Sequence, residues 1–172
     1  MLTFSKERSP QLSPTHLNEV VADCVELVRV RSEQEGVDLV FQPARTSEEV
    51  LLDSDAIHRA VLNLLTNALD AVAESLTKRI RVTIAINADQ EFLIDVEDSG
   101  PGIALEDREK IFSLFESTKG SQGTGIGLAV TAKIMHEHGG RVEVMTPASD
   151  QGSCFRLTLP APRPASASET LA

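Results

Sequence analysis

Two asparagines in one predicted helix have the type and spacing to hold a cation. Asn63 and Asn67, in the segment NLLTNALDA, are four residues apart, so a helix places them on one face. Asparagine is a mediocre helix former, and here it interrupts an apolar flank. One interpretation is a polar stripe at the edge of the core. The other is that the side-chain oxygens hold Mg²⁺, which binds through few protein oxygens plus phosphate and water.

A carboxylate in the segment VEDSGPGI is the second candidate. The residues before it predict a strand that delivers Asp98 into a turn containing Gly100 and Gly102. Such residues also form plain turns, which is the structural alternative. A carboxylate only accepts hydrogen bonds, so in a pocket Asp98 would bind a donor such as an exocyclic amine. The glycines would let a flat ligand approach the backbone closely.

The third candidate is the glycine-rich segment STKGSQGTGIGLAV. Its glycines, which precede residues with apolar helical spacing, are Gly120, Gly123, Gly125 and Gly127. Unpaired amides at a helix N-terminus attract phosphate, and glycine lets phosphate reach them. Lys119 adds an ammonium group that could meet a terminal phosphate. A flexible linker has a similar composition, and neither a Walker A motif nor Rossmann spacing is present, so this segment alone is weak evidence.

Long helices are predicted to position these segments. The first is capped by Thr15 and ended by Gly36. Its apolar face consists of Leu17, Val20, Val21, Cys24, Leu27 and Val28. The second is capped by Asp53 or Asp55. Its apolar face consists of Ile57, Val61, Leu64, Leu65, Ala68, Leu69 and Val72.

A third long helix runs from about Gly127 to Glu137 and ends at Gly139 or Gly140. The segment ALEDREKIF predicts a short amphipathic helix. The predicted strands are VDLVFQ, EVLLD, RIRVTIAIN, EFLIDVED, RVEVMT and SCFRLTL, and ADQ joins the third and fourth as a hairpin. We therefore expect an α/β (α+β) two-layer sandwich, with three long helices on one face of a mixed, mostly antiparallel sheet.

Composition narrows the class of protein. The 172 residues fit one domain with a real core. The net charge of −10 and the lack of Tyr and Trp argue against nucleic acid as a partner. No apolar run approaches the ~20 residues of a membrane span, and no signal peptide is visible, so we expect a cytoplasmic location. Cys24 and Cys154 lack metal or redox spacing. Residues 1–14 predict an arm or linker, and 161–172 a disordered tail.

Taken together, the three candidate segments resemble a known family. In order and spacing, NLLTNALDA, DSGPG, IFSLF, GTGIGLAV, HEHGGRVEV and GSCFRLTLP resemble the catalytic and ATP-binding domain of bacterial sensor histidine kinases. Gyrase, MutL and heat-shock chaperone ATPases belong to the same superfamily, whose fold is the Bergerat type. NALDAV is most similar to the nitrogen-regulation and dicarboxylate-sensing branch. The resemblance covers residues 15–160.

The resemblance implies a role for each matching residue. Asn67 would coordinate Mg²⁺, with Asn63 supporting it near the phosphates, and Asp98 would bind the adenine amine of ATP. An ATP lid would span residues 104–125, with Phe112 and Phe115 as apolar anchors. Together with Lys119, the two asparagines would be the catalytic residues. The other residues implied to bind ATP are Asp70, Ala71, Gly100, Gly102, Ile103, Gly120, Thr124, Gly125, Ile126, Gly127, Leu128 and Thr158.

Two departures from the family pattern qualify this reading. Many sensor kinases have a basic and an aromatic residue where this chain has Asp70 and Ala71. Lys119 is therefore our candidate for the missing phosphate contact. The histidines are His16, His58, His136 and His138, and none lies in a phosphoacceptor context. The resemblance thus implies transfer of the γ-phosphoryl group to a histidine on a separate dimerisation domain, with a response regulator downstream. It also implies a monomeric isolated domain and a homodimeric full-length kinase.

Other functions remain as alternatives. A hydrolysing ATPase of the same superfamily would carry a glutamate base one turn before the metal-binding asparagine. Asn63 occupies that position, and an amide does not take a proton from water. A degenerate nucleotide-binding interaction module and a serine-directed anti-sigma kinase are further alternatives.

Overall fold

A five-stranded sheet forms one layer of the protein. The computed structural model describes residues 9–46, 48–113, 126–147, 149 and 151–161. The strands of the sheet are β2 (Asp38–Gln42), β4 (Arg79–Ile86), β5 (Phe92–Asp98), β6 (Arg141–Met145) and β7 (Ser153–Leu159). Their order is β2-β4-β5-β7-β6, in which β2 and β4 are parallel and every other pair is antiparallel. The mixed, mostly antiparallel sheet is therefore confirmed.

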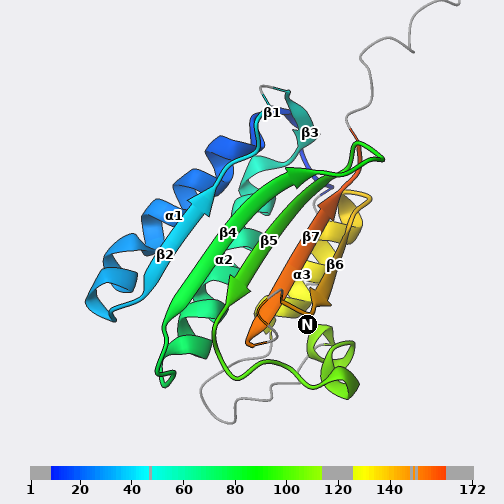
Figure 1. Cartoon of the computed structure of the whole chain (residues 1–172). Coiled ribbons are helices and arrows are strands. Elements are labelled where there is room, and N and C mark those ends of the chain that lie inside the picture. The colour runs from blue at the N-terminus through cyan, green and yellow to red at the C-terminus, as the bar shows by residue number, and fades with distance from the viewer. Residues whose placement is uncertain (1–8, 47, 114–125, 148, 150, 162–172) are drawn as a thin grey trace, which may run out of the picture.

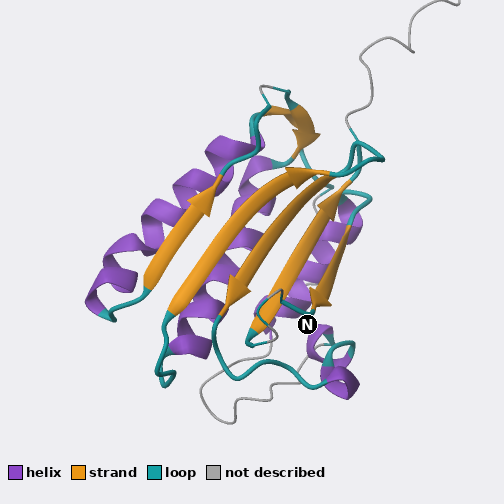
Figure 2. Cartoon of the chain, viewed as in Figure 1, coloured by secondary structure: helices purple, strands orange, loops and turns teal. Residues whose placement is uncertain are grey.

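Three helices form the second layer. They are α1 (Leu17–Gln34), α2 (Ser54–Val72) and α3 (Ile126–Glu137), and all lie on the same face of the sheet (Figures 1 and 2). No helix among the described residues is long and apolar enough to cross a membrane. The two short strands β1 (Ser13–Thr15) and β3 (Val50–Leu52) form a separate antiparallel pair. The predicted two-layer sandwich is thus the observed architecture.

The core lies between the sheet and the helices. Strands β4 and β5 alternate between buried and less buried positions, as strands with one covered face must. On α2, all seven apolar residues predicted from helical spacing are buried. Asp53, and not Asp55, caps this helix, because its side chain accepts a hydrogen bond from the Ala56 amide. The helix is therefore held at its start and packed along its length.

The other face of the sheet is charged. Arg156 on β7 makes two hydrogen bonds of 2.7 Å to its register partner Asp95 on β5. Bidentate pairing of this kind is stronger than a single contact between exposed charges.

Both cysteines are buried, and burial raises the pKa of the Cys24 and Cys154 thiols to about 12. Neutral, buried thiols agree with the absence of metal or redox spacing.

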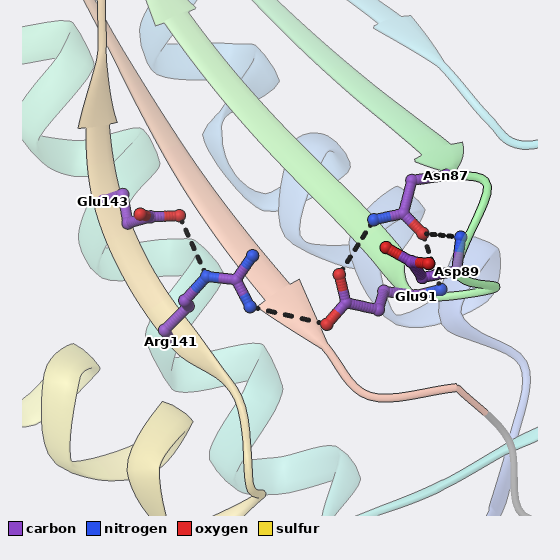
Figure 3. A network of polar contacts seen from close by, with 5 residues as sticks. All are labelled: Asn87, Asp89, Glu91, Arg141 and Glu143. Carbon is purple, nitrogen blue, oxygen red and sulfur yellow. Dashed lines mark hydrogen bonds and ion pairs between the residues drawn. The ribbon is translucent and has the colours of Figure 1, made fainter.

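The predicted hairpin between β4 and β5 is organised by Asn87 (Figure 3). Its side-chain oxygen accepts hydrogen bonds from the amides of Asp89 and Glu91, both at 3.0 Å. Its amide nitrogen donates to the Glu91 carboxylate, which lowers the pKa of that group. Arg141 on β6 then contacts both Glu91 and Glu143. The turn is fixed by side chains at the end of the sheet away from Asp98.

The start of α1 differs from the prediction. His16, and not Thr15, precedes the helix, and it makes no side-chain cap. Thr15 belongs to β1, and its hydroxyl donates to the Ser13 carbonyl. Strand β1 also crosses the boundary predicted between an arm and the domain. Within the helix, Leu27 is 65% exposed whereas Val25 is buried, so the predicted apolar face was wrong at that position. Gly36, with a φ of +69°, ends the helix as expected.

Two other segments complete the comparison with prediction. The amphipathic helix predicted over ALEDREKIF is instead two 3₁₀ turns, Leu105–Asp107 and Lys110–Phe112. The third long helix begins at Ile126, and Gly139 beyond its end has the left-handed φ of +70° that the prediction required. The helix predicted over ALEDREKIF was therefore wrong, because neither 3₁₀ turn is long enough to be an α-helix.

Candidate functional site

The first asparagine joins two helices. The Asn63 amide nitrogen on α2 donates to the Gly127 carbonyl on α3 at 3.1 Å, and lies 3.4 Å from the Thr131 hydroxyl. Thr131 in turn donates to the same Gly127 carbonyl at 2.9 Å. These contacts fix the first turn of α3, which follows the glycine-rich segment, against the middle of α2. Asn63 and Gly127 are therefore brought together, as the predicted site requires.

The second asparagine lies one turn further along α2. Asn67 is half-buried, and its side-chain amide makes no hydrogen bond to any residue that the structure describes. A half-buried amide can serve as an oxygen ligand without first breaking an internal contact. Within the described ranges, no three His, Cys, Asp or Glu side chains gather as a metal cage. A cation here would thus depend on asparagine oxygen together with oxygens of a ligand.

The carboxylate of Asp98 is fixed at the end of β5. It is 4% exposed, and its Oδ1 accepts a hydrogen bond from the Gly100 amide at 2.8 Å. A Cβ on Gly100 would lie 2.8 Å from the Ala71 carbonyl, so the turn presses against the last turn of α2. Asp98, Gly100 and Ala71 therefore meet at one end of α2. Here glycine is required by close approach of backbone to backbone.

Gly152 is a residue beside the candidate site that the sequence reasoning missed. Its φ is +91°, and a Cβ there would collide with the Asp98 carbonyl oxygen. The next residue, Ser153, is 5% exposed and is the register partner of Asp98. The motif GSCFRLTLP contains both residues, but our prediction took Thr158 from it. Small residues just before the strand were the signal that could have identified them.

Replacing Gly152 should therefore disturb the position of Asp98. We expect Gly152→Ala to lower the free energy of unfolding by about 2 kcal/mol, because strained φ and a backbone collision add. Gly36→Ala is the matched control, since its φ is also positive but no atom lies within 4 Å of its Cβ position. That control should cost about 1 kcal/mol. Urea unfolding measures both, and equal losses would show that the contact with Asp98 does not matter.

Two predicted site residues lie elsewhere. Thr158 is the register partner of Leu93 and Arg141, on the face of the sheet opposite to the helices and several residues along the strand from Ser153. The Asp70 carboxylate pairs with Arg31 of α1 at 2.8 Å. This pairing also raises the pKa of the Arg31 guanidinium, chiefly through the hydrogen bond to Asp70. The structure therefore brings neither residue together with Asn63 and Asp98.

The remaining predicted residues divide into three groups. Ile103, Phe112 and Leu128 pack against the core, and the Phe112 ring meets Phe155 of β7 edge-on, with 6.2 Å between centroids. Ile126, at the start of α3, is 43% exposed. Phe115, Lys119, Gly120, Thr124 and Gly125 lie outside the described residues, as does most of the predicted lid.

A hollow of about 330 Å³ lies at the same end of the sheet, beside Asp98. It is lined by Arg79, Arg81 and Glu97 among others. Arg81 on β4 is 4.0 Å from Glu97 on β5, and Arg79 is 3.5 Å from Asp38 on β2. The two arginines face carboxylates on the open face of the sheet, but Asp98 also lines the hollow, so the hollow adjoins the site formed by Asn63, Asn67 and Asp98.

The fold and the meeting of α2, α3 and the end of β5 define a class of ATP-binding domain. Residues 52–163 match the family described as histidine kinase-, DNA gyrase B- and HSP90-like ATPase. This match covers more than half of the chain, and the chain therefore belongs to that family. Membership confirms the resemblance inferred from the spaced motifs.

Curated relatives are sensor kinases. The chain is 33% identical over 160 residues to the signal transduction histidine-protein kinase AtoS of Escherichia coli K12, covering 93% of this chain and 26% of AtoS. It is 30% identical over 166 residues to the nitrogen regulation protein NtrY of Azorhizobium caulinodans, covering 94% of this chain and 21% of NtrY. The chain thus spans about a quarter or less of these two relatives.

Solved structures agree in fold. The nucleotide-free catalytic domain of the histidine kinase ThkA has a TM-score of 0.78 and 30% identity, covering 88% of this chain and 97% of that one. Full-length ShkA in complex with AMPPNP has a TM-score of 0.77 and 25% identity, covering 90% of this chain and 32% of that one. ThkA in complex with the response regulator TrrA has a TM-score of 0.76 and 28% identity, covering 91% and 44%. The ThkA catalytic domain corresponds to almost the whole of this chain.

Proposed function

We propose that this chain is the catalytic domain of a sensor histidine kinase, which binds Mg-ATP and transfers the γ-phosphoryl group to a histidine on a separate dimerisation domain. One observation carries the proposal. Asn63 fixes the start of α3 against α2, while Asp98 and Gly100 are packed against the end of the same helix. Residues suited to phosphate, cation and amine are thus held on one rigid frame.

The described residues around the site fit Mg-ATP as the ligand. Asn67 has a half-buried side-chain amide with no hydrogen bond in the described part of the chain, which leaves its oxygen available to Mg²⁺. At Gly127, packing does not demand glycine, because a Cβ would lie 3.6 Å from Asn63, an ordinary contact. Its missing side chain instead leaves room beside the first amides of α3, where a phosphate would bind. Asp98, an acceptor, would receive the adenine amine.

Phosphoryl transfer depends mainly on positioning and on stabilising charge. In the proposed reaction the bond from the γ-phosphorus to the bridging oxygen of ATP breaks, and a bond to the acceptor histidine nitrogen forms. Bound Mg²⁺ would neutralise charge on the phosphate oxygens. The protein would hold the adenine through Asp98, the metal through Asn67 and the phosphates through the start of α3. Lys119, outside the described residues, is our candidate for a further positive charge.

Hydrolysis is the competing reaction, and Asn63 disfavours it. Superfamily hydrolases place a base one turn before the metal ligand, where this chain has an amide. That amide is already hydrogen-bonded to Gly127 and close to Thr131, so it holds the helices together. We therefore propose that the γ-phosphoryl group is transferred to histidine and not to water.

The proposal is tested by transfer in trans. We expect the chain alone to show no acid-labile, base-stable label from γ-labelled ATP, because none of its four histidines lies in a phosphoacceptor context. Added to a purified dimerisation domain of the sensor-kinase type, it should label that domain's histidine. Phosphate release without such labelling would favour a hydrolase. Absence of both, with ATP still bound, would favour a non-catalytic module.

Partners and location follow from the same proposal. ThkA, one of the structural neighbours, forms a complex with a response regulator. We propose that a response regulator likewise receives the phosphoryl group from the acceptor histidine in this system. We further propose a cytoplasmic location, a monomeric isolated domain and a homodimeric complete kinase, with no nucleic acid as ligand.

A further inference from the structure

Three elements that are distant in sequence meet at Asp53. Its Oδ1 accepts from the Ala56 amide at 3.2 Å and so caps α2. Its Oδ2 accepts from the Gln11 amide at 2.9 Å, just ahead of β1. Its own backbone amide donates to Nε2 of His138, beyond the end of α3, at 3.0 Å. A single residue thus contacts the entering chain and one end of each of two helices.

The contact with His138 requires one tautomer of the ring. Because Nε2 accepts from the Asp53 amide, it carries no proton. The proton is then on Nδ1, which donates to the Ile134 carbonyl at 2.7 Å. That second bond belongs to the last turn of α3, so the ring links α3 to the residue that caps α2. The helix pair is therefore fastened at the end away from Asn67 and Gly127.

The entering strand is paired along one side. Among the described residues, β1 pairs with β3, through Ser13 with Leu52 and Thr15 with Val50. A two-stranded pair of this length is marginal in water by itself. The strand leads directly into α1, whose first residue, Leu17, is buried. The contact from Gln11 to Asp53 adds a second attachment on the other side of β1 along the chain.

The charge of Asp53 matches these contacts. The Gln11 amide is the main cause that lowers the pKa of the Asp53 carboxyl group, and the Ala56 amide acts in the same direction. The carboxylate form is thus the one that the surroundings stabilise. Only a carboxylate offers two acceptor oxygens, one for each amide.

We propose that Asp53 is a latch that fastens the incoming strand β1 to the start of α2 and the end of α3. The latch sets where the preceding chain joins the helix pair that carries Asn63, Asn67 and Gly127. Its use in a kinase rests on the proposed function, whereas the latch itself does not. The latch lies at the end of α2 and α3 that is away from Asn67 and Gly127.

Asp53→Asn separates the two roles of the carboxylate. An amide has one acceptor oxygen, so the variant can serve Gln11 or Ala56 but not both. Since asparagine caps helices as well as aspartate does, the helix should keep the oxygen and the strand should lose it. We expect hydrogen exchange of the amides of Gln11, Ser13 and Thr15 to rise about tenfold, the value of one hydrogen bond. Strands β4 and β5 should be unaffected.

Asp55→Asn is the matched control. Asp55 is exposed in the same first turn, so its replacement removes the same charge without touching β1. The control should leave exchange in β1 unchanged. Unchanged exchange in both Asp53→Asn and Asp53→Ala would overturn the latch, and so would equal acceleration of β1, β4 and β5. Mg-ATP affinity, measured on the same samples, tests the proposed function separately and should be wild-type in Asp53→Asn.

Discussion

The Asp98→Asn variant should bind Mg-ATP about ten- to hundredfold more weakly than the wild-type chain, the range expected when a hydrogen bond to a charged group is lost. The physical reason lies in the Gly100 amide, which donates to Asp98 Oδ1 at 2.8 Å. An asparagine would keep its only oxygen on that amide. Its NH₂ group would then stand where the adenine amine needs an acceptor, and two donors would face each other.

The base of the nucleotide provides a sharper test than affinity alone. Inosine triphosphate has a carbonyl where ATP has the amine. Wild-type protein should therefore prefer ATP, and Asp98→Asn should lose or reverse that preference, because its NH₂ can donate to a carbonyl. Calorimetry with both nucleotides measures this. A general loss of folding would weaken both nucleotides equally.

Glu97→Gln is the control for charge. Glu97 is the neighbour of Asp98 on β5, but it faces the open side of the sheet, where it lies 4.0 Å from Arg81. Its replacement removes the same charge from the next residue without changing the amine contact. Unchanged ATP affinity and selectivity in Asp98→Asn would refute the assignment of Asp98 to adenine.

Patterns that depend on local periodicity were predicted well from the sequence. All seven apolar residues predicted on α2 are buried, because a helix that crosses the core shows a continuous stripe. Leu27 on α1 failed because it directly precedes Val28 and so lies about 100° around the helix from it. A residue at the margin of a stripe is placed by how the helix rolls on the sheet, which spacing does not encode.

Features that depend on distant partners were missed. Thr15 has the side chain of a cap, but pairing with Val50 takes it into β1 instead. The need for Gly152 arises from Asp98, a residue far away in the sequence. Thr158 was predicted from a motif match, yet strand alternation from Ser153 already places it on the other face of β7. The position of Thr158 on that face could have been predicted, because period-two alternation is itself a sequence signal.

The candidate site shows the same division. The i, i+4 spacing correctly placed Asn63 and Asn67 on neighbouring turns of α2, and the family resemblance gave the metal to Asn67, but the spacing alone did not distinguish their contacts. In the structure Asn63 holds Gly127, whereas Asn67 has no hydrogen-bonded partner among the described residues. Only the tertiary contact with α3 separates a residue that joins helices from a residue available to a cation. The effect that we expect for Asn67→Ala depends on this difference.

Asn67→Ala should abolish most phosphoryl transfer, by about a hundredfold or more, because the metal and the phosphates would lose their common anchor on α2. Thr66→Ala is the matched control: Thr66 is the exposed neighbour on the same helix, and its loss should leave transfer unchanged. The affinity for ATP should be measured with Mg²⁺ and again with the metal chelated.

If Asn67 binds the metal, the variants should differ in how ATP affinity responds to Mg²⁺. Wild-type protein should lose ATP affinity when Mg²⁺ is removed, whereas Asn67→Ala should respond much less, because its metal contact is already gone. Asn67→Asp, which keeps a side-chain oxygen, should restore part of the Mg²⁺ response. If Asn67→Ala instead keeps both full transfer and the full response to Mg²⁺, the cation is held elsewhere, and Asn67 is only a polar residue at the edge of the core.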